Sequence, residues 1–169
     1  MKQNFYMCLS MLLKHEGGFV NHPKDPGGMT NLGVTKKAFE EYKGTEVSEQ
    51  EMRDLLPTDV TPFYREKYWD KIKGDDLPAG VDWAVFDWCV NSGPSRAARA
   101  LQVVVNATAD GAIGPKTLEK VSEREASEII KDLHAVRQEF YENLSTFDTF
   151  GKGWTRRNKE TLEQALEMV

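Results

Sequence analysis

The sequence is poor in cysteine, in basic clusters and in long apolar runs, and each shortage excludes a class of protein. It has only two cysteines, Cys8 and Cys89, both in apolar surroundings, so we expect buried free thiols in a reducing compartment rather than a disulfide. No run approaches the roughly 18 apolar residues that span a bilayer. The net charge is -5 and no basic run is longer than Arg156-Arg157, which argues against nucleic acid as a partner.

The first thirteen residues, MKQNFYMCLSMLL, do not have the pattern of a signal peptide. Polar residues interrupt their apolar core, and no small-residue cleavage site follows. The segment is typical of an amphipathic helix instead. We therefore expect a soluble protein that is synthesised in the cytoplasm without a signal peptide.

What the sequence does have is the composition of a globular, helical protein. Hydrophobic residues make up 40% and charged residues 29% of the chain, with four Trp and eight Phe. Apolar residues recur at helical spacing almost throughout. We predict a mostly α fold with a small loop or β-hairpin near the front. The predicted helices cover residues 5–16, 35–42, 58–72, 80–93, 94–105 and 122–144, with others starting at Ser48, at Pro115 and near Trp154.

Several helix ends are marked by capping residues. Gly17 and its neighbour Gly18 should end the first helix, and Thr35 can cap a helix that stops at Gly44. Ser48 and Glu51 have the spacing of a capping box.

The most informative segment is HEGGFVNHPKDPGGMTNLGVT, residues 15–35, in which two carboxylates lie nine residues apart. Glu16 continues an apolar stripe that includes Leu12 and Leu13, so its side chain should point toward the interior. It also lies at a helix C-terminus, where the free carbonyls disfavour an ionised carboxylate. We therefore expect Glu16 to keep its proton near neutral pH, as a general acid must.

Asp25 lies in the turn-rich loop, where water and turn N–H groups should keep it ionised. Two carboxyl groups in such different environments are typical of glycosidic bond hydrolysis, in which one protonates the leaving oxygen and the other activates water. Thr30 could help to hold that water, and the neighbouring glycines let the backbone approach a bulky sugar. The simpler alternative is that Glu16 is a solvated helix end and that Asp25 caps a turn.

The same segment resembles the signature of glycoside hydrolase family 108, the phage and prophage N-acetylmuramidases. The resemblance rests on EGGFVNHPKDPGGMTNLGVT and on YREKYWDKIKGDDLPAGVDWAVFDWCVNSG. The later NSGPSRAARALQVVVNATADGAIGPKTL and GKGWTRRNKE are similar to the peptidoglycan-binding module that accompanies this family. The resemblance implies a lysozyme-like helical fold, with a muramidase catalytic lobe at 1–92 and a helical peptidoglycan-binding lobe at 93–169.

The resemblance also implies an activity, a set of site residues and a route to the substrate. The enzyme would be an endolysin that needs no cofactor and hydrolyses the β-1,4 bond between N-acetylmuramic acid and N-acetylglucosamine, with Glu16 as the general acid. Glu16, Asp25 and Thr30 resemble the Glu-Asp-Thr set of phage-type lysozymes, although Thr35 is a competitor for the third place. By analogy we expect a monomer, an inverting reaction and carboxyl groups about 6.5 to 9.5 Å apart. A holin would give access to the cell wall.

Three further residues are candidates for contact with the glycan. Tyr68 and Trp69 could stack on sugar rings, because aromatic faces suit the apolar faces of a glycan. They could equally be core residues. Asn91 ends a helix in a pattern similar to that of the family, so it could reach the cleft or simply cap the helix.

Other functions fit the sequence less well. Residues 106–117 resemble a calcium loop, but Thr117 stands where the bidentate Glu should be, so a tight Asp-Gly turn is the better interpretation and no metal site is predicted. A zinc amidase would use histidines, yet His15, His22 and His134 do not have a ligand spacing such as HExxH. The remaining alternative is a non-catalytic peptidoglycan-binding or secretion-accessory protein.

Overall fold

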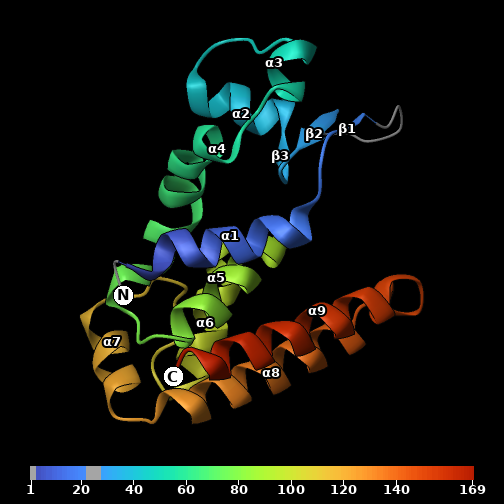
Figure 1. Ribbon diagram of the computed structural model, residues 1–169. Helices are drawn as coiled ribbons and strands as arrows, with labels where there is room; N and C mark the ends of the chain where they lie inside the picture. Colours follow the sequence, from blue (N-terminus) through green and yellow to red (C-terminus); the bar gives the residue numbers. More distant parts are fainter. Residues whose placement is uncertain (1–2, 22–27) are drawn as a thin grey trace. The chain divides into compact units, whose positions relative to one another are not determined.

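The structure is a computed structural model of the chain, and it describes residues 3–21 and 28–169. This part of the chain is mostly helical, with one small antiparallel sheet (Figure 1). The α-helices are α1 (Asn4–Glu16), α2 (Lys36–Lys43), α3 (Glu49–Arg53), α4 (Pro57–Tyr64), α5 (Val81–Ser92), α6 (Pro94–Val104), α7 (Pro115–Ser122), α8 (Ala126–Glu142) and α9 (Phe147–Glu167). The strands are β1 (Val20–Asn21), β2 (Met29–Asn31) and β3 (Val34–Thr35), in the order β1-β2-β3.

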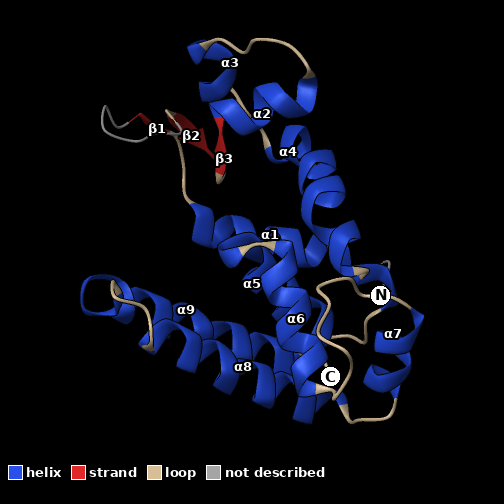
Figure 2. Cartoon of the chain, turned by 180° about the vertical axis from the view of Figure 1, so that it is seen from behind, coloured by secondary structure: helices blue, strands red, loops and turns tan. Residues whose placement is uncertain are grey.

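The prediction of a mostly α fold with a small hairpin near the front and a helical C-terminal part is confirmed (Figure 2). The predicted caps are present as well. The Thr35 hydroxyl accepts a hydrogen bond from the Ala38 N–H at 3.1 Å, and Gly44 ends α2 in the left-handed conformation. Ser48 and Glu51 form the reciprocal capping box of α3.

The helix predicted over residues 58–72 was wrong in its second half. The α-helix ends at Tyr64, and a π-helical turn (Arg65–Trp69) and two 3₁₀ turns (Asp70–Ile72 and Gly74–Asp76) follow. The fully buried Trp69 explains the change, since its indole N–H donates to Asp75 at 2.9 Å and Gly74 lies against its ring. The chain turns tightly around this ring instead of continuing as a regular helix.

Two helix starts also differ from the prediction. Ser122 ends α7 rather than opening α8, which begins at Ala126. The last helix begins at Phe147, seven residues before Trp154. Gly151 makes this early start favourable, because the Phe147 ring lies over it and would be 2.6 Å from a methyl group at that position.

The chain divides into two compact units, one made of Tyr6–Lys67 and the other of Met1–Phe5 with Tyr68–Val169. In the unit of residues 6–67, β2 packs against α3 and β3 against α2 (Figure 1). Its core is apolar and formed by Val34, Phe39, Val47, Met52, Val60 and Phe63.

The unit of residues 68–169 is built around α5, which packs against α6, α8 and α9, while α8 and α9 run side by side (Figure 1). A buried carboxylate, Asp87 of α5, joins this helix to α8 and α9. Arg157 donates to both of its oxygens, with a shortest distance of 2.9 Å. Arg137 Nη2 lies 2.8 Å from Asp87 Oδ2, as an ion pair outside hydrogen-bond geometry. Although burial alone would raise the pKa of Asp87, the two guanidinium groups outweigh it and lower that pKa.

No helix within the described ranges is long and apolar enough to cross a membrane.

Candidate active site

Glu16 is the last residue of α1, and its side chain is half-buried. Most of the apolar stripe that precedes it is buried, with Leu9 4% and Leu12 0% exposed, while Leu13 is half-buried. Gly17 then leaves the helix with a φ of 66°, a left-handed conformation that suits glycine. The predicted helix end is therefore confirmed, and it fixes the point at which the Glu16 side chain leaves the backbone.

The β2–β3 hairpin lies directly beside Glu16. Leu32 and Gly33 form its two-residue turn, and both have positive φ angles, 52° and 76°. A methyl group added to Gly33 would lie 2.9 Å from both Cβ and Cγ of Glu16 and 2.6 Å from the hydroxyl of Tyr64. Glycine at position 33 thus allows the turn, Glu16 and Tyr64 to come together.

Side-chain hydrogen bonds anchor this hairpin to the helices around it. The buried Asn31 donates to the Met52 carbonyl at 2.8 Å, at the end of α3. Thr35 caps α2 through its hydroxyl. Tyr64, in α4, donates its hydroxyl to the Leu32 carbonyl at 2.7 Å. With both strands and the turn fixed, the hairpin is a rigid support next to Glu16.

Thr30 lies in the middle strand of the sheet. It pairs with Val20 of β1 and with Thr35 of β3. Cross-strand partners project from the same face of a sheet, so the two threonines share a face. The Thr35 hydroxyl already caps α2, whereas the role of the Thr30 hydroxyl stays a prediction.

Asp25 and His22 lie outside the described residues. The residues on either side of this segment are described: Asn21 pairs with Met29 between β1 and β2. The role of Asp25 therefore stays a prediction.

The predicted sugar-contact residues belong to the other compact unit. Trp69 is 0% exposed and packs against Phe5 and Phe86, with ring centroids 5.3 and 5.2 Å away. An indole enclosed in this way has no face free for a sugar, so its surroundings are those of a core residue. Tyr68 is half-buried, and we retain it as a candidate for glycan contact.

Asn91 is half-buried in the last turn of α5 and takes part in a hydrogen-bond network. Its side-chain oxygen accepts hydrogen bonds from the hydroxyls of Ser92, at 2.7 Å, and of Tyr141. Arg137 in turn donates to the Tyr141 hydroxyl at 2.9 Å. These bonds orient the Asn91 amide, and its contact with substrate remains a prediction.

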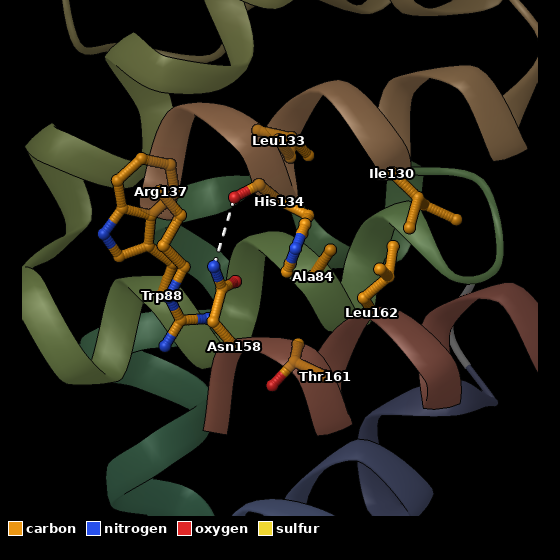
Figure 3. A pocket seen from close by; sticks show the side chains of 9 residues that line it. All are labelled: Ala84, Trp88, Ile130, Leu133, His134, Arg137, Asn158, Thr161 and Leu162. Atoms are coloured by element: carbon orange, nitrogen blue, oxygen red, sulfur yellow. Dashed lines mark hydrogen bonds between the residues drawn. The ribbon is translucent and has the colours of Figure 1, made fainter. Parts of the chain in front are cut away.

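Two cavities in the unit of residues 68–169 differ greatly in size. A small one lies between α5, α8 and α9, where Asn158 donates to the His134 carbonyl at 3.1 Å (Figure 3). Its volume of about 10 Å³ has room for roughly one water molecule and excludes a sugar. A hollow of about 760 Å³ lies over the loop before α7, and its lining includes Thr108, Lys116 and Lys120.

That loop is held in place by Gln102, which is fully buried. Its amide donates to Asp110, to the Ala112 carbonyl and to Thr117, and it accepts from the Gly111 N–H at 2.9 Å. The loop is therefore organised around a glutamine side chain and contains the predicted Asp-Gly turn. In residues 3–21 and 28–169, no group of three or more His, Cys, Asp or Glu side chains could hold a metal ion.

Sequence reasoning missed Leu32, Gly33 and Tyr64. The dipeptide Leu-Gly between two short polar and apolar stretches is a weak hairpin signal, because such turns favour Asn or Asp at the first position. Tyr64 is distant from the hairpin in sequence, and an aromatic residue on an apolar helix face indicates only burial. Its hydroxyl contact could not be predicted without the fold.

A helical fold in which a glutamate ends the first helix beside a small antiparallel hairpin defines a lysozyme-like protein. Residues 9–93 match the family described as Glycosyl hydrolase 108, and residues 96–159 match the family described as Predicted Peptidoglycan domain. The chain belongs to the glycosyl hydrolase 108 family. The solved structure of Brucella abortus SagA is 45% identical, with a TM-score of 0.88, and the match covers 99% of this chain and 97% of that chain. A search of curated proteins found no match. These similarities support a glycoside hydrolase with a peptidoglycan-directed role.

Proposed function

We propose that the protein is an N-acetylmuramidase that hydrolyses the β-1,4 bond between N-acetylmuramic acid and N-acetylglucosamine in peptidoglycan. The observation that carries the proposal is the position of Glu16. Its half-buried side chain ends α1 and lies against an anchored hairpin, inside the segment that matches the hydrolase family. A general acid needs a carboxyl group at such a point, within reach of the leaving oxygen.

In the proposed reaction, Glu16 donates its proton to the glycosidic oxygen as the bond from that oxygen to the anomeric carbon breaks. Asp25 accepts a proton from a water molecule, whose oxygen bonds to the anomeric carbon from the opposite side. Thr30 helps to hold this water. The product is an inverted reducing sugar, and proton return from Asp25 to Glu16 through solvent restores the enzyme. Tyr68 and Asn91 would contact the glycan.

We propose that residues 1–92 form the catalytic lobe and that residues 93–169 bind the cell wall. The hollow over residues 106–120 is a candidate for the wall contact, because Gln102 preorganises its loop and the peptidoglycan-domain match includes it. In a sedimentation assay with insoluble peptidoglycan, Lys116→Glu should lower the bound fraction. The same charge change at the exposed Lys131 of α8 should not.

We further propose that the protein acts as an endolysin on the cell wall and works as a monomer. Access would depend on a second protein that opens the membrane, which by family analogy is a holin. The competing function is wall binding without catalysis, and the match of residues 96–159 to a peptidoglycan domain is what favours it.

Product analysis separates these functions. Purified peptidoglycan is digested, the new reducing ends are reduced with borohydride, and the resulting sugar alcohols are identified after acid hydrolysis. A muramidase gives muramitol, whereas glucosaminitol would mean cleavage of the other glycosidic bond. Free amino groups without new reducing ends would indicate an amidase. Binding with no released product would favour the non-catalytic function.

A further inference from the structure

Tyr64 has no role in the proposed chemistry, yet its hydroxyl lies at the point where the hairpin meets Glu16. We propose that Tyr64 is a positioning residue, which acts through the Leu32–Gly33 turn to hold the Glu16 side chain in its catalytic orientation. The inference rests on the proposed function of Glu16 as the general acid.

The contact chain has two steps, and both lie within the compact unit of residues 6–67. In the first step, the Tyr64 hydroxyl donates to the Leu32 carbonyl at 2.7 Å. In the second, the Gly33 backbone lies so close to Glu16 that an added methyl group would be 2.9 Å from its Cβ and Cγ. Tyr64 is 1% exposed, so its ring is fixed by packing and its hydroxyl is a rigid donor.

The conformation of the turn explains why it needs such a donor. Leu32 has a φ of 52°, in the left-handed region that side chains other than glycine, asparagine and aspartate rarely adopt. A leucine there persists only where the surrounding structure holds it. The hydrogen bond from Tyr64 to its carbonyl supplies that restraint at the strained residue itself.

The consequence for Glu16 is a smaller choice of side-chain conformations. The Gly33 backbone occupies the space beside Cβ and Cγ, so rotamers that would swing the stem of Glu16 into this space are excluded. A general acid has to lie within hydrogen-bond reach of the leaving oxygen, and a displacement of about 1 Å can cost roughly a hundredfold in rate. Loss of the restraint should therefore lower kcat and leave KM nearly unchanged.

The test compares Tyr64→Phe with Tyr42→Phe, using soluble glycan strands of peptidoglycan as the substrate. Both changes remove one phenolic oxygen from the same compact unit, and both rings pack edge-on against Phe63, but only Tyr64 donates to Leu32. We expect Tyr64→Phe to lower kcat by about tenfold or more, with KM within about twofold of the wild type. Tyr42→Phe should keep both constants. Thermal melting shows that each variant is folded at the assay temperature.

A second pair of variants tests the contact between Gly33 and Glu16. This pair keeps the positioning role testable if Tyr64→Phe does not fold. Gly33 and Gly44 have φ angles of 76° and 72°, so alanine is comparably strained at both positions. Only at position 33 would the new methyl group meet Glu16, since nothing lies within 4 Å of the one at position 44. Gly33→Ala should lower kcat much more than Gly44→Ala.

The results distinguish a failure of the positioning role of Tyr64 from a failure of the proposed hydrolase function on which that role rests. Failure of the wild type to release reducing ends would remove the proposed function itself. An active wild type with Tyr64→Phe equal to Tyr42→Phe would overturn the positioning role alone. A rise in KM at constant kcat would also overturn it, because the residue would then serve binding rather than the orientation of Glu16.

Discussion

Thr30 and Thr35 are paired across the β2–β3 hairpin, but only the Thr35 hydroxyl caps a helix. The two threonines compete for the same place in the proposed site, and from this difference we propose separate tasks for them. The Thr35 hydroxyl caps α2. The Thr30 side chain projects from the same face of the sheet, and its hydroxyl caps no helix.

Alanine at each position should therefore have a different effect. Thr35→Ala removes an N-cap, so it should lower the free energy of unfolding by about 1 kcal/mol and leave kcat unchanged. Thr30→Ala should lower kcat by about tenfold or more, with a change in stability below about 0.5 kcal/mol. Urea unfolding and turnover on peptidoglycan measure the two effects. The reverse pattern would transfer the catalytic role to Thr35.

Asp87 should make the stability of the fold depend on pH. Its pKa in the folded protein is lowered from the ordinary value of 3.8, so the unfolded chain binds more protons in acid. The contribution of this carboxylate is present above pH about 4 and is lost as the pH falls through the lowered pKa. Urea unfolding from pH 7 to pH 2.5 would follow the loss.

The variant Asp87→Asn supplies the control for that pH dependence. It leaves Arg137 and Arg157 without their shared counter-ion, so we expect a loss of about 3–5 kcal/mol at pH 7 and a flatter pH profile. Asp148→Asn, at an exposed position in the first turn of α9, should cost less than about 1 kcal/mol and leave the pH profile nearly unchanged. An unchanged profile for Asp87→Asn would show that other carboxylates control acid unfolding.

The two thiols should be unreactive in the folded protein. Cys8 and Cys89 are buried and form no disulfide, and burial raises the pKa of the Cys89 thiol to about 12. Since only the thiolate reacts, about one Cys89 in ten thousand would be reactive at pH 8 even if reagent could reach it. Labelling with a thiol reagent should be slow until denaturant exposes both groups. Rapid labelling of two thiols in the native protein would contradict the burial of both cysteines.

The helices that could be predicted from sequence are those whose ends are marked by local chemistry. Thr35, Gly44 and the Ser48-Glu51 pair define the bounds of α2 and the start of α3 through hydrogen bonds within a few residues. Pro94 and Pro115 begin α6 and α7. These starts are also local signals, because proline suits the first helical turn.

The features that could not be predicted depend on contacts between distant residues. The chain leaves the α-helix after Tyr64 because the Trp69 ring is enclosed by groups from several elements, and Gly151 lies inside α9 although glycine disfavours helices. The strands have two or three residues each, too few for a periodic pattern. At the candidate site, the place of Glu16 in an apolar stripe made it a candidate from the sequence, whereas the contact of Tyr64 with Leu32 spans 32 residues.

The central claim is that Glu16 supplies the proton for glycosidic cleavage. The most direct measurement is the rate at which Glu16→Gln releases reducing ends from purified peptidoglycan, beside Glu41→Gln at an exposed position of α2. General acid catalysis contributes about a hundredfold or more, so Glu16→Gln should lose at least that factor at an unchanged melting temperature, while Glu41→Gln keeps the wild-type rate. A folded Glu16→Gln variant with about a third of the wild-type rate would contradict the claim, because the amide cannot donate a proton to the leaving oxygen as the acid does.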